Sequence, residues 1–248
     1  MSSAPRGRAR VALVEDHVLF AEALEIALSV RGYDVRRIDL PETSRTVSTL
    51  LPVILRARPG IVLLDLDLGE HGRGMHLIDP LSDAGIAVVI VTANTDRVEW
   101  AECMRLGARK VIPKNTHLND ILAAVRRIYH GFPVVSREER AELAQLWRTH
   151  RSDTQELRAR LDLLTHREQE VLGYLMTGHH VQEIAALSVV SAATVRTQVK
   201  SILAKLEVGS QLAAVGLANR AGWRQPRAAR APGMPELGYA RARARDVH

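Results

Sequence analysis

Short apolar runs alternate with amphipathic stretches along the first 130 residues, and few folds are compatible with that order. Five runs rich in β-branched residues are suited to strands: residues 11–14, 33–38, 61–64, 87–91 and 110–112. Two of them are apolar at nearly every position, as expected for strands covered on both faces. Apolar side chains at helical spacing occupy three neighbouring stretches, residues 19–28, 47–55 and 118–128. The alternation predicts an α/β domain over residues 11–130, with a doubly wound five-stranded parallel sheet.

The following segment, residues 131–162, reads as a helical linker. Within residues 137–164, seven positions recur at alternating spacings of four and three, which is a heptad seam: Leu143, Trp147, His150, Thr154, Leu157, Leu161 and Leu164. The seam fits two structures about equally well. It is either one helix packed on its own domains or a parallel coiled coil across a dimer.

Residues 163–223 predict a small all-helical domain. Thr165 and Glu168 have the spacing of a capping box at the start of one helix. We expect a second helix over residues 182–188, a third capped by Ser191, and a fourth over residues 211–221.

Charge and composition bound the class of protein. The net charge of +6 lies in the ends: residues 1–10 carry +3 and residues 224–248 carry +4, and we expect both tails to be disordered. A single cysteine, Cys103, excludes an intrachain disulfide framework and a multi-cysteine zinc site. The longest apolar stretch, residues 86–93, is too short to cross a bilayer, and residues 1–6 lack the apolar core of a secretory signal. These features predict a cytoplasmic protein with no membrane partner.

Polar side chains follow the ends of the predicted strands. Glu15 and Asp16 follow the first strand, Asp65 the third, Thr92 the fourth and Lys114 the fifth. The carboxyl ends of adjacent parallel strands meet at one edge of a sheet, so these side chains are expected to share a pocket. Clustered carboxylates suit Mg²⁺, and a hydroxyl and an ammonium beside them would stabilise a phosphoryl group transferred to one carboxylate. Each residue alone is explained as a solvated strand end, but five such coincidences are improbable.

This set of residues resembles the receiver domain of two-component response regulators, a flavodoxin-like fold. The resemblance covers residues 11–130 and rests on four stretches: Val14-Glu15-Asp16-His17, residues 59–65, residues 90–93, and Gly107-Ala108 leading to Pro113-Lys114. It implies that Asp65 accepts phosphate from a sensor histidine kinase or a small phosphodonor. It also implies direct binding of Mg²⁺ by Asp16 and binding through water by Glu15, while Thr92 and Lys114 contact the phosphoryl group.

Two positions depart from the pattern of that family. Val111 stands at the switch position, where an aromatic residue is usual, so coupling of phosphorylation to the outer face is expected to be weaker or to work differently. Asp67 stands where the family supplies only a backbone carbonyl to Mg²⁺, and its carboxylate could alter the metal affinity. Strand phasing favours Asp65 over Asp67 as the phosphoacceptor.

The third predicted helix of the second domain carries cations on one face. Its apolar residues take the core-facing positions, which leaves Arg196, Thr197 and Lys200 together on the exposed face. Such a helix can enter a major groove, where Arg and Lys contact guanine or phosphate and Thr contacts a methyl group or phosphate. Taken alone, this pattern is better explained by a solvated basic face.

The surrounding residues resemble the LuxR/NarL-type helix-turn-helix domain. The resemblance spans residues 163–223 and rests on residues 164–172, Glu183-Ile184-Ala185, residues 193–197 and residues 202–206. It implies a recognition helix over residues 192–206 and dimeric binding to paired half-sites. We therefore assign DNA binding to five side chains: Thr194, Arg196, Thr197, Lys200 and Lys205. The chain departs from the family at three positions, Gln182, Val189 and Gln198.

Together these features predict a non-enzymatic, DNA-binding transcriptional response regulator, phosphorylated on Asp65 and homodimeric on double-stranded DNA. Two alternatives remain open. One is a phosphorylation-independent DNA-binding regulator with an atypical receiver, which Val111 favours. The other is a Mg²⁺-dependent phosphohydrolase that forms an aspartyl phosphate, supported only by the weak Asp65-Leu66-Asp67 match.

Overall fold

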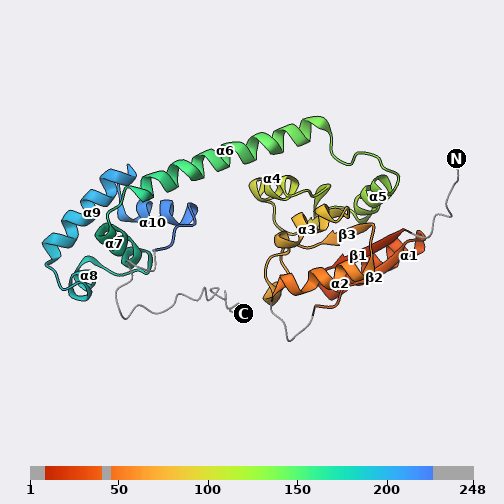
Figure 1. Ribbon diagram of the computed structural model, residues 1–248, viewed down its shortest axis with the longest axis horizontal. Coiled ribbons are helices and arrows are strands. Elements are labelled where there is room, and N and C mark those ends of the chain that lie inside the picture. The colour runs from red at the N-terminus through yellow and green to blue at the C-terminus, as the bar shows by residue number, and fades with distance from the viewer. Residues whose placement is uncertain (1–8, 41–45, 226–248) are drawn as a thin grey trace, which may run out of the picture. The chain divides into compact units, whose positions relative to one another are not determined.

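The computed structural model describes residues 9–40 and 46–225, so most of each predicted basic tail lies outside the described residues. The chain forms two compact units, residues 1–150 and 151–248. Figure 1 shows a twisted sheet with surrounding helices in the first unit and helices alone in the second.

The first unit contains the predicted five-stranded parallel sheet. Its strands are β1 (Arg10–Val14), β2 (Asp34–Arg37), β3 (Ile61–Leu64), β4 (Ala87–Thr92) and β5 (Lys110–Pro113). They lie in the order β2-β1-β3-β4-β5, and every neighbouring pair is parallel. Val14 pairs with Leu64, which brings the carboxyl ends of β1 and β3 side by side. The predicted doubly wound α/β fold is therefore confirmed.

Helices cover both faces of this sheet. The helical segments that precede the linker are α1 (Val18–Val30), η1 (Val47–Thr49), α2 (Leu50–Ala57), η2 (Gly69–His71), η3 (Gly74–Leu77), α3 (Ile78–Asp83), α4 (Arg97–Arg105) and α5 (Leu118–Tyr129). Leu24 of α1 and Ile121 of α5 share one core with Val11 and Leu13. The alternate β1 residues pack in the other core, with α2 and α3. Because successive strand side chains point to opposite faces, an entirely apolar strand serves both cores.

The segment after β3 turns back tightly over the strand, and Gly74 makes this possible. A Cβ atom at Gly74 would lie 2.1 Å from the carbonyl oxygen of Asp65, closer than any side chain can be placed. The amide of Gly74 donates a hydrogen bond to the carbonyl of Leu66 at 2.9 Å. The close approach fixes the backbone around Asp65 at the end of its strand.

One long helix, α6 (Arg137–Asp162), occupies most of the predicted linker. In the first unit its Leu143 is buried, and the guanidinium of Arg105 in α4 lies 5.0 Å from the centre of the Trp147 ring. In the second unit Leu157 and Leu161 pack against that unit's own core. Both ends of the heptad seam are therefore occupied by packing within this chain, and the coiled coil across a dimer stays a prediction.

The second unit is the predicted all-helical domain, with α7 (His166–Met176), α8 (Val181–Leu187), α9 (Ala192–Leu206) and α10 (Gln211–Arg220). The capping box of Thr165 and Glu168 is confirmed, with both of its hydrogen bonds present. Ser191 caps α9 as predicted, accepting a hydrogen bond from the amide of Thr194 at 3.0 Å.

Glu168 does more than cap α7. Its buried carboxylate also accepts hydrogen bonds from the Ser201 hydroxyl at 2.6 Å and the Lys205 ammonium at 2.7 Å, both on α9. Burial alone would raise the pKa of Glu168, but the hydrogen bonds from Lys205, Ser201 and Thr165 outweigh it and lower the pKa to about 2. This carboxylate therefore ties the start of α7 to α9.

Within the described residues no single helix is long and apolar enough to cross a membrane. Helices α9 and α10 are long and apolar enough to span a bilayer only when they are added together, and they are bent by 53° relative to each other.

We predict that Glu168→Gln destabilises the helical unit by about 2 kcal/mol, because the variant loses charge-assisted hydrogen bonds and leaves Lys205 with a weaker partner. Amide hydrogen exchange of α7 and α9 in the full chain should become about 30-fold faster. Because the folded-state pKa lies below the ordinary 4.5, the difference should be complete above pH 4.5 and shrink as the pH falls towards 2.

The control is Glu207→Gln, at an exposed glutamate whose ion pair with Arg160 should contribute little. Equal exchange in wild type and Glu168→Gln would contradict the structural role of this carboxylate.

Candidate functional site

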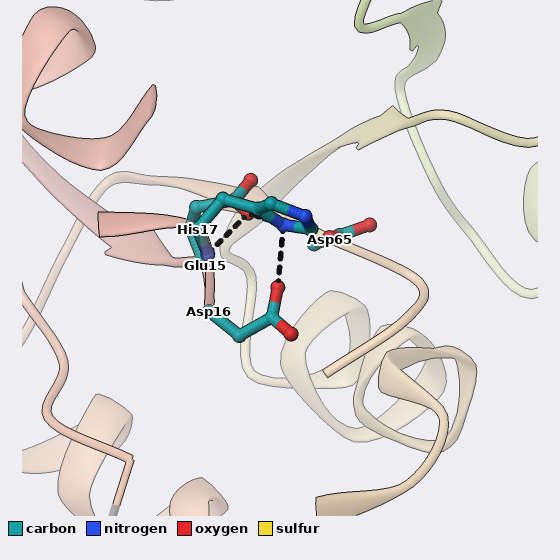
Figure 2. Close-up of side chains that lie close together, drawn as sticks. All are labelled: Glu15, Asp16, His17 and Asp65. Carbon is teal, nitrogen blue, oxygen red and sulfur yellow. Dashed lines mark hydrogen bonds and ion pairs between the residues drawn. The ribbon is translucent and has the colours of Figure 1, made fainter. Parts of the chain in front are cut away.

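The acidic residues predicted from the strand ends meet at one edge of the sheet. Glu15 and Asp16 follow β1, and Asp65 follows β3 and is only 3% exposed. Ligand atoms of these three carboxylates and of His17 all lie within 4.8 Å of one another. Figure 2 shows the four side chains gathered around one point, with His17 contacting both Glu15 and Asp16. The sequence predicted the carboxylates as ligands, whereas His17 is added to the group by the structure.

Lys114, which follows β5, neutralises part of this acidic cluster. Its ammonium donates hydrogen bonds to Asp65 Oδ2 at 2.7 Å and to Glu15 Oε1 at 2.6 Å, and it lies 5.2 Å from the centre of the Phe20 ring. Burial would lower the pKa of Lys114, but the hydrogen bonds and charges of Asp65 and Glu15 outweigh it and raise that pKa. Lys114 therefore stays charged beside Asp65.

The environment of the Glu15 carboxyl disfavours its charged form. Burial raises its pKa, and hydrogen bonds from Lys114 and the His17 backbone amide oppose that rise without cancelling it. The nearby charge of Asp65 raises the pKa further. The pocket holds more negative charge than its single ammonium balances.

One carboxylate oxygen of the pocket lacks a hydrogen bond. Asp16 Oδ1 is buried, and its 2.8 Å contact with His17 Nδ1 is a close ion-pair distance without the geometry of a hydrogen bond. A buried carboxylate oxygen without a hydrogen bond is costly, and a hard divalent cation would satisfy it. Three carboxylates on two adjacent strand ends offer the oxygen ligands that Mg²⁺ prefers. The residues present therefore fit Mg²⁺.

Asp67 stands apart from the cluster of ligand atoms. Its backbone amide donates to Asp65 Oδ1 at 3.1 Å, and its own carboxylate accepts from the amide of Gly69 at 3.3 Å. The side chain of Asp67 is exposed. Asp67 thus orients Asp65 through its backbone, and its contribution of a carbonyl to a metal remains a prediction.

Thr92 and Val111 lie on the neighbouring strands. Thr92 is the last residue of β4 and lies two residues beyond Ile90, which pairs with Leu64 of β3. It is 2% exposed, and its hydroxyl accepts a hydrogen bond from the backbone amide of Asn94 at 3.1 Å. Val111 on β5 is 8% exposed and packs in the same core as Cys103 of α4. The switch position therefore faces α4 with a small apolar side chain.

A polar link that the sequence pattern does not predict joins the loop after Asp65 to α4. The guanidinium of Arg73 pairs with the carboxylate of Glu99, a buried residue in the first turn of α4, and the Asn94 amide also donates to Glu99. Arg73 forms an isolated bridge with Asp67. An acidic residue in a first helical turn is common, so nothing in the local sequence marks Glu99 as buried or identifies Arg73 as its partner.

In the second unit, α9 presents the predicted exposed face. Arg196, Thr197 and Lys200 are all exposed, and among the described residues neither Arg196 nor Lys200 has a hydrogen-bond or ion-pair partner for its cation. The Thr197 hydroxyl donates to the carbonyl of Ala193 at 3.1 Å, and the hydroxyls of Thr194 and Ser191 lie 2.8 Å apart. Two unpaired cations on one helix face could contact phosphates or base edges.

Lys205 lies in a different environment from the other assigned DNA-binding residues. Its ammonium bonds the buried carboxylate of Glu168, and its side chain is 30% exposed. The structure thus places Lys205 in the contact between α7 and α9 instead of on the free face of α9. Helical spacing alone does not reveal this partner, because Glu168 is 37 residues away in the sequence.

The turn before α9 keeps a left-handed backbone although no glycine is present. Val189 has φ of 53° and is 91% exposed. A β-branched residue in this region is strained by roughly 1–2 kcal/mol. The departure from glycine therefore costs stability but leaves the turn geometry in place.

Two protein-family models match the chain. The model of the response regulator receiver domain matches residues 11–126. The model of bacterial regulatory proteins of the luxR family matches residues 162–218.

Response regulators are also similar to the chain over most of its length. The response regulator protein VraR of Staphylococcus saprophyticus is 28% identical over 208 residues, covering 83% of this chain and 94% of that protein. VraR of Staphylococcus epidermidis is 31% identical over 160 residues, covering 64% of this chain and 73% of that protein. The nitrate/nitrite response regulator protein homolog of Haemophilus influenzae is 26% identical, covering 84% and 95%.

A solved structure of RcsB from Salmonella enterica serovar Typhimurium, bound to promoter rprA in the presence of phosphomimetic BeF3-, is 18% identical with a TM-score of 0.46. The alignment covers 86% of this chain and 99% of that one.

We predict that Asp16→Asn weakens Mg²⁺ binding by about tenfold or more, because it removes one of three clustered carboxylates. Isothermal titration calorimetry of the full chain with MgCl₂ measures this change. The control is Asp39→Asn, at an exposed carboxylate that lines the same cavity as Glu15 and Asp16 but is not part of the ligand cluster, and it should leave the affinity nearly unchanged. Wild-type affinity in Asp16→Asn would exclude this cluster as the metal site.

Proposed function

Because the chain belongs to the transcriptional response regulators that join a receiver domain to a LuxR-type DNA-binding domain, we propose that Asp65 is its phosphoacceptor and α9 its recognition helix. The observation that carries the first assignment is the contact of Lys114 with buried Asp65. The exposed and unpaired cations of α9 carry the second.

In the proposed transfer, a carboxylate oxygen of Asp65 attacks the phosphorus of a phosphohistidine on a sensor kinase or of acetyl phosphate. The new bond joins this oxygen to phosphorus, while the bond from phosphorus to the donor nitrogen or carboxylate oxygen breaks and the leaving group keeps its electron pair. Lys114 stays protonated and pairs with the incoming phosphoryl oxygens. The Thr92 hydroxyl is assigned to the same group.

Mg²⁺ would be held by Asp16 directly, by Glu15 through water, by Asp65 and by the Asp67 carbonyl. When bound, it supplies positive charge that offsets the phosphoryl oxygens. The orphaned Asp16 oxygen and the clustered carboxylates support this assignment.

The second unit is proposed to bind operator DNA as part of a homodimer, with one α9 in each of two half-sites. Residues 163–223 carry a net charge of only +1, so general attraction to phosphates is weak. Affinity and sequence preference are therefore assigned to Arg196, Thr197 and Lys200. Such a regulator works where the chromosome is, so we place it in the cytoplasm and assign it no enzymatic turnover.

Val111 favours a second candidate function, DNA binding that does not depend on phosphorylation. A buried valine offers a smaller volume than an aromatic ring to follow Thr92 inward. In that case the receiver would serve as a dimerisation or ligand-binding module.

We predict that Asp65→Asn abolishes labelling of the chain by radioactive acetyl phosphate in the presence of Mg²⁺, because the amide is not a nucleophile for phosphorus. Asp67→Asn is the matched control, and it should retain labelling. Label that persists in Asp65→Asn and disappears in Asp67→Asn would move the acceptor to Asp67.

We also predict that Arg196→Ala and Lys200→Ala each weaken operator binding about tenfold. The operator is first recovered by chromatin immunoprecipitation, and affinity is then measured by fluorescence anisotropy. Arg220→Ala, which removes an exposed cation from α10, should have little effect. Wild-type affinity in both α9 variants would reject the recognition-helix assignment.

The same titration with and without acetyl phosphate separates the two candidate functions. Tighter operator binding after phosphorylation supports the phosphorylation-dependent regulator. Identical affinity supports the phosphorylation-independent one.

A further inference from the structure

A second cavity lies at the amino ends of the strands, at the opposite edge of the sheet from Asp65. Its volume is about 600 Å³, within the range of small-molecule pockets. It is lined by the start of β1, β3 and β4, the residue before β5, the end of α5, the loop after it and the first turn of α6. All of these segments belong to the first unit.

Three arginines from separate segments line this cavity, and none of its described lining residues is acidic. Arg10 is already engaged, because it bonds the Asp34 carboxylate and the Ala57 carbonyl, each at 2.8 Å. Arg109 and Arg140 are exposed, and within the described part of the chain their guanidinium groups have no hydrogen-bond or ion-pair partner. Arginine is abundant in this chain, so the number of arginines carries little weight. What sets this cavity apart is that two unpaired guanidinium groups line it.

The wall of the cavity is held in place by other cations. The Arg127 guanidinium donates two hydrogen bonds to the Pro133 carbonyl, at 2.9 and 2.6 Å, and the Lys110 ammonium donates to the Val134 carbonyl at 3.0 Å. These bonds fix the loop between α5 and α6. A ligand would therefore meet a preorganised wall, which lowers the entropic cost of binding.

Aromatic rings line the same cavity and are partly exposed to solvent. Tyr129 is 39% exposed and Phe132 is 59% exposed, and both contact the ring of His130, at centroid distances of 5.2 and 6.4 Å. Aromatic residues make up only 4% of the chain. Exposed rings beside unpaired guanidinium groups suit a ligand that has a planar ring and an anionic group.

We propose that this cavity binds a small phosphate ester that carries a planar ring, of the size of a nucleoside monophosphate. Arg109 and Arg140 would bind the phosphate, and Phe132 and Tyr129 would contact the ring. Because Arg140 lies on α6 and Arg109 immediately precedes β5, the ligand would link the start of the linker helix to the sheet. The site does not use Asp65 or its neighbours, so it is independent of the phosphorylation proposed above.

The test is isothermal titration calorimetry of the full, unphosphorylated chain with AMP, in the absence of Mg²⁺. Arg109→Ala and Arg140→Ala should each weaken AMP binding about tenfold, and the double variant should abolish it. Arg56→Ala, an exposed arginine outside the cavity, is the matched control. Arg109→Lys should keep part of the affinity because it keeps the charge, which distinguishes a ligand contact from a loss of folding.

Two further probes test the ligand class. Adenosine lacks the phosphate and ribose 5-phosphate lacks the base, so each should bind at least about tenfold more weakly than AMP. Failure of AMP to bind the wild-type chain, or unchanged AMP affinity in the double variant, would overturn the proposal. Equal affinity for ribose 5-phosphate and AMP would overturn the assignment of the aromatic wall.

Discussion

The ammonium of Lys114 is the contact on which the chemistry of the first unit depends. It bonds the carboxylates of Glu15 and Asp65, which come from different strands and would otherwise repel each other in a buried pocket. The parallel sheet makes this contact possible, because it brings the carboxyl ends of β1, β3 and β5 to one edge. The same arrangement leaves an oxygen of Asp16 without a hydrogen bond, so the pocket remains suited to a cation.

The second unit uses a similar device for a structural purpose. Glu168 is a buried carboxylate held by a lysine from another helix, and its depressed pKa shows that the charged form is the stable one. The two sites differ in what remains unsatisfied. Glu168 accepts hydrogen bonds from Thr165, Ser201 and Lys205, whereas the pocket at Asp65 keeps excess negative charge. The first carboxylate is therefore suited to holding helices together and the second to reaction.

Several structural details had no local signal in the sequence. Arg73 and Glu99 are 26 positions apart and meet only because the loop after β3 lies against the first turn of α4. Lys205 has helical spacing suited to a DNA-facing cation, yet a distant carboxylate takes its ammonium. Helix α4 itself lacks a clear apolar stripe, since a glutamate occupies one of its buried positions. Pairing over long sequence distances depends on packing, and periodicity does not encode it.

The order of apolar runs was enough to predict the parallel sheet, since only strands covered on both faces tolerate apolar side chains at every position. It was also enough to predict that Glu15, Asp16, Asp65, Thr92 and Lys114 end their strands at one edge, because a parallel sheet aligns its carboxyl ends. Tertiary structure alone decided which of these groups touch, which oxygen is left without a hydrogen bond and which cations stay unpaired. Those outcomes depend on distances of a few ångströms between segments far apart in the chain, and such distances arise only when the elements pack.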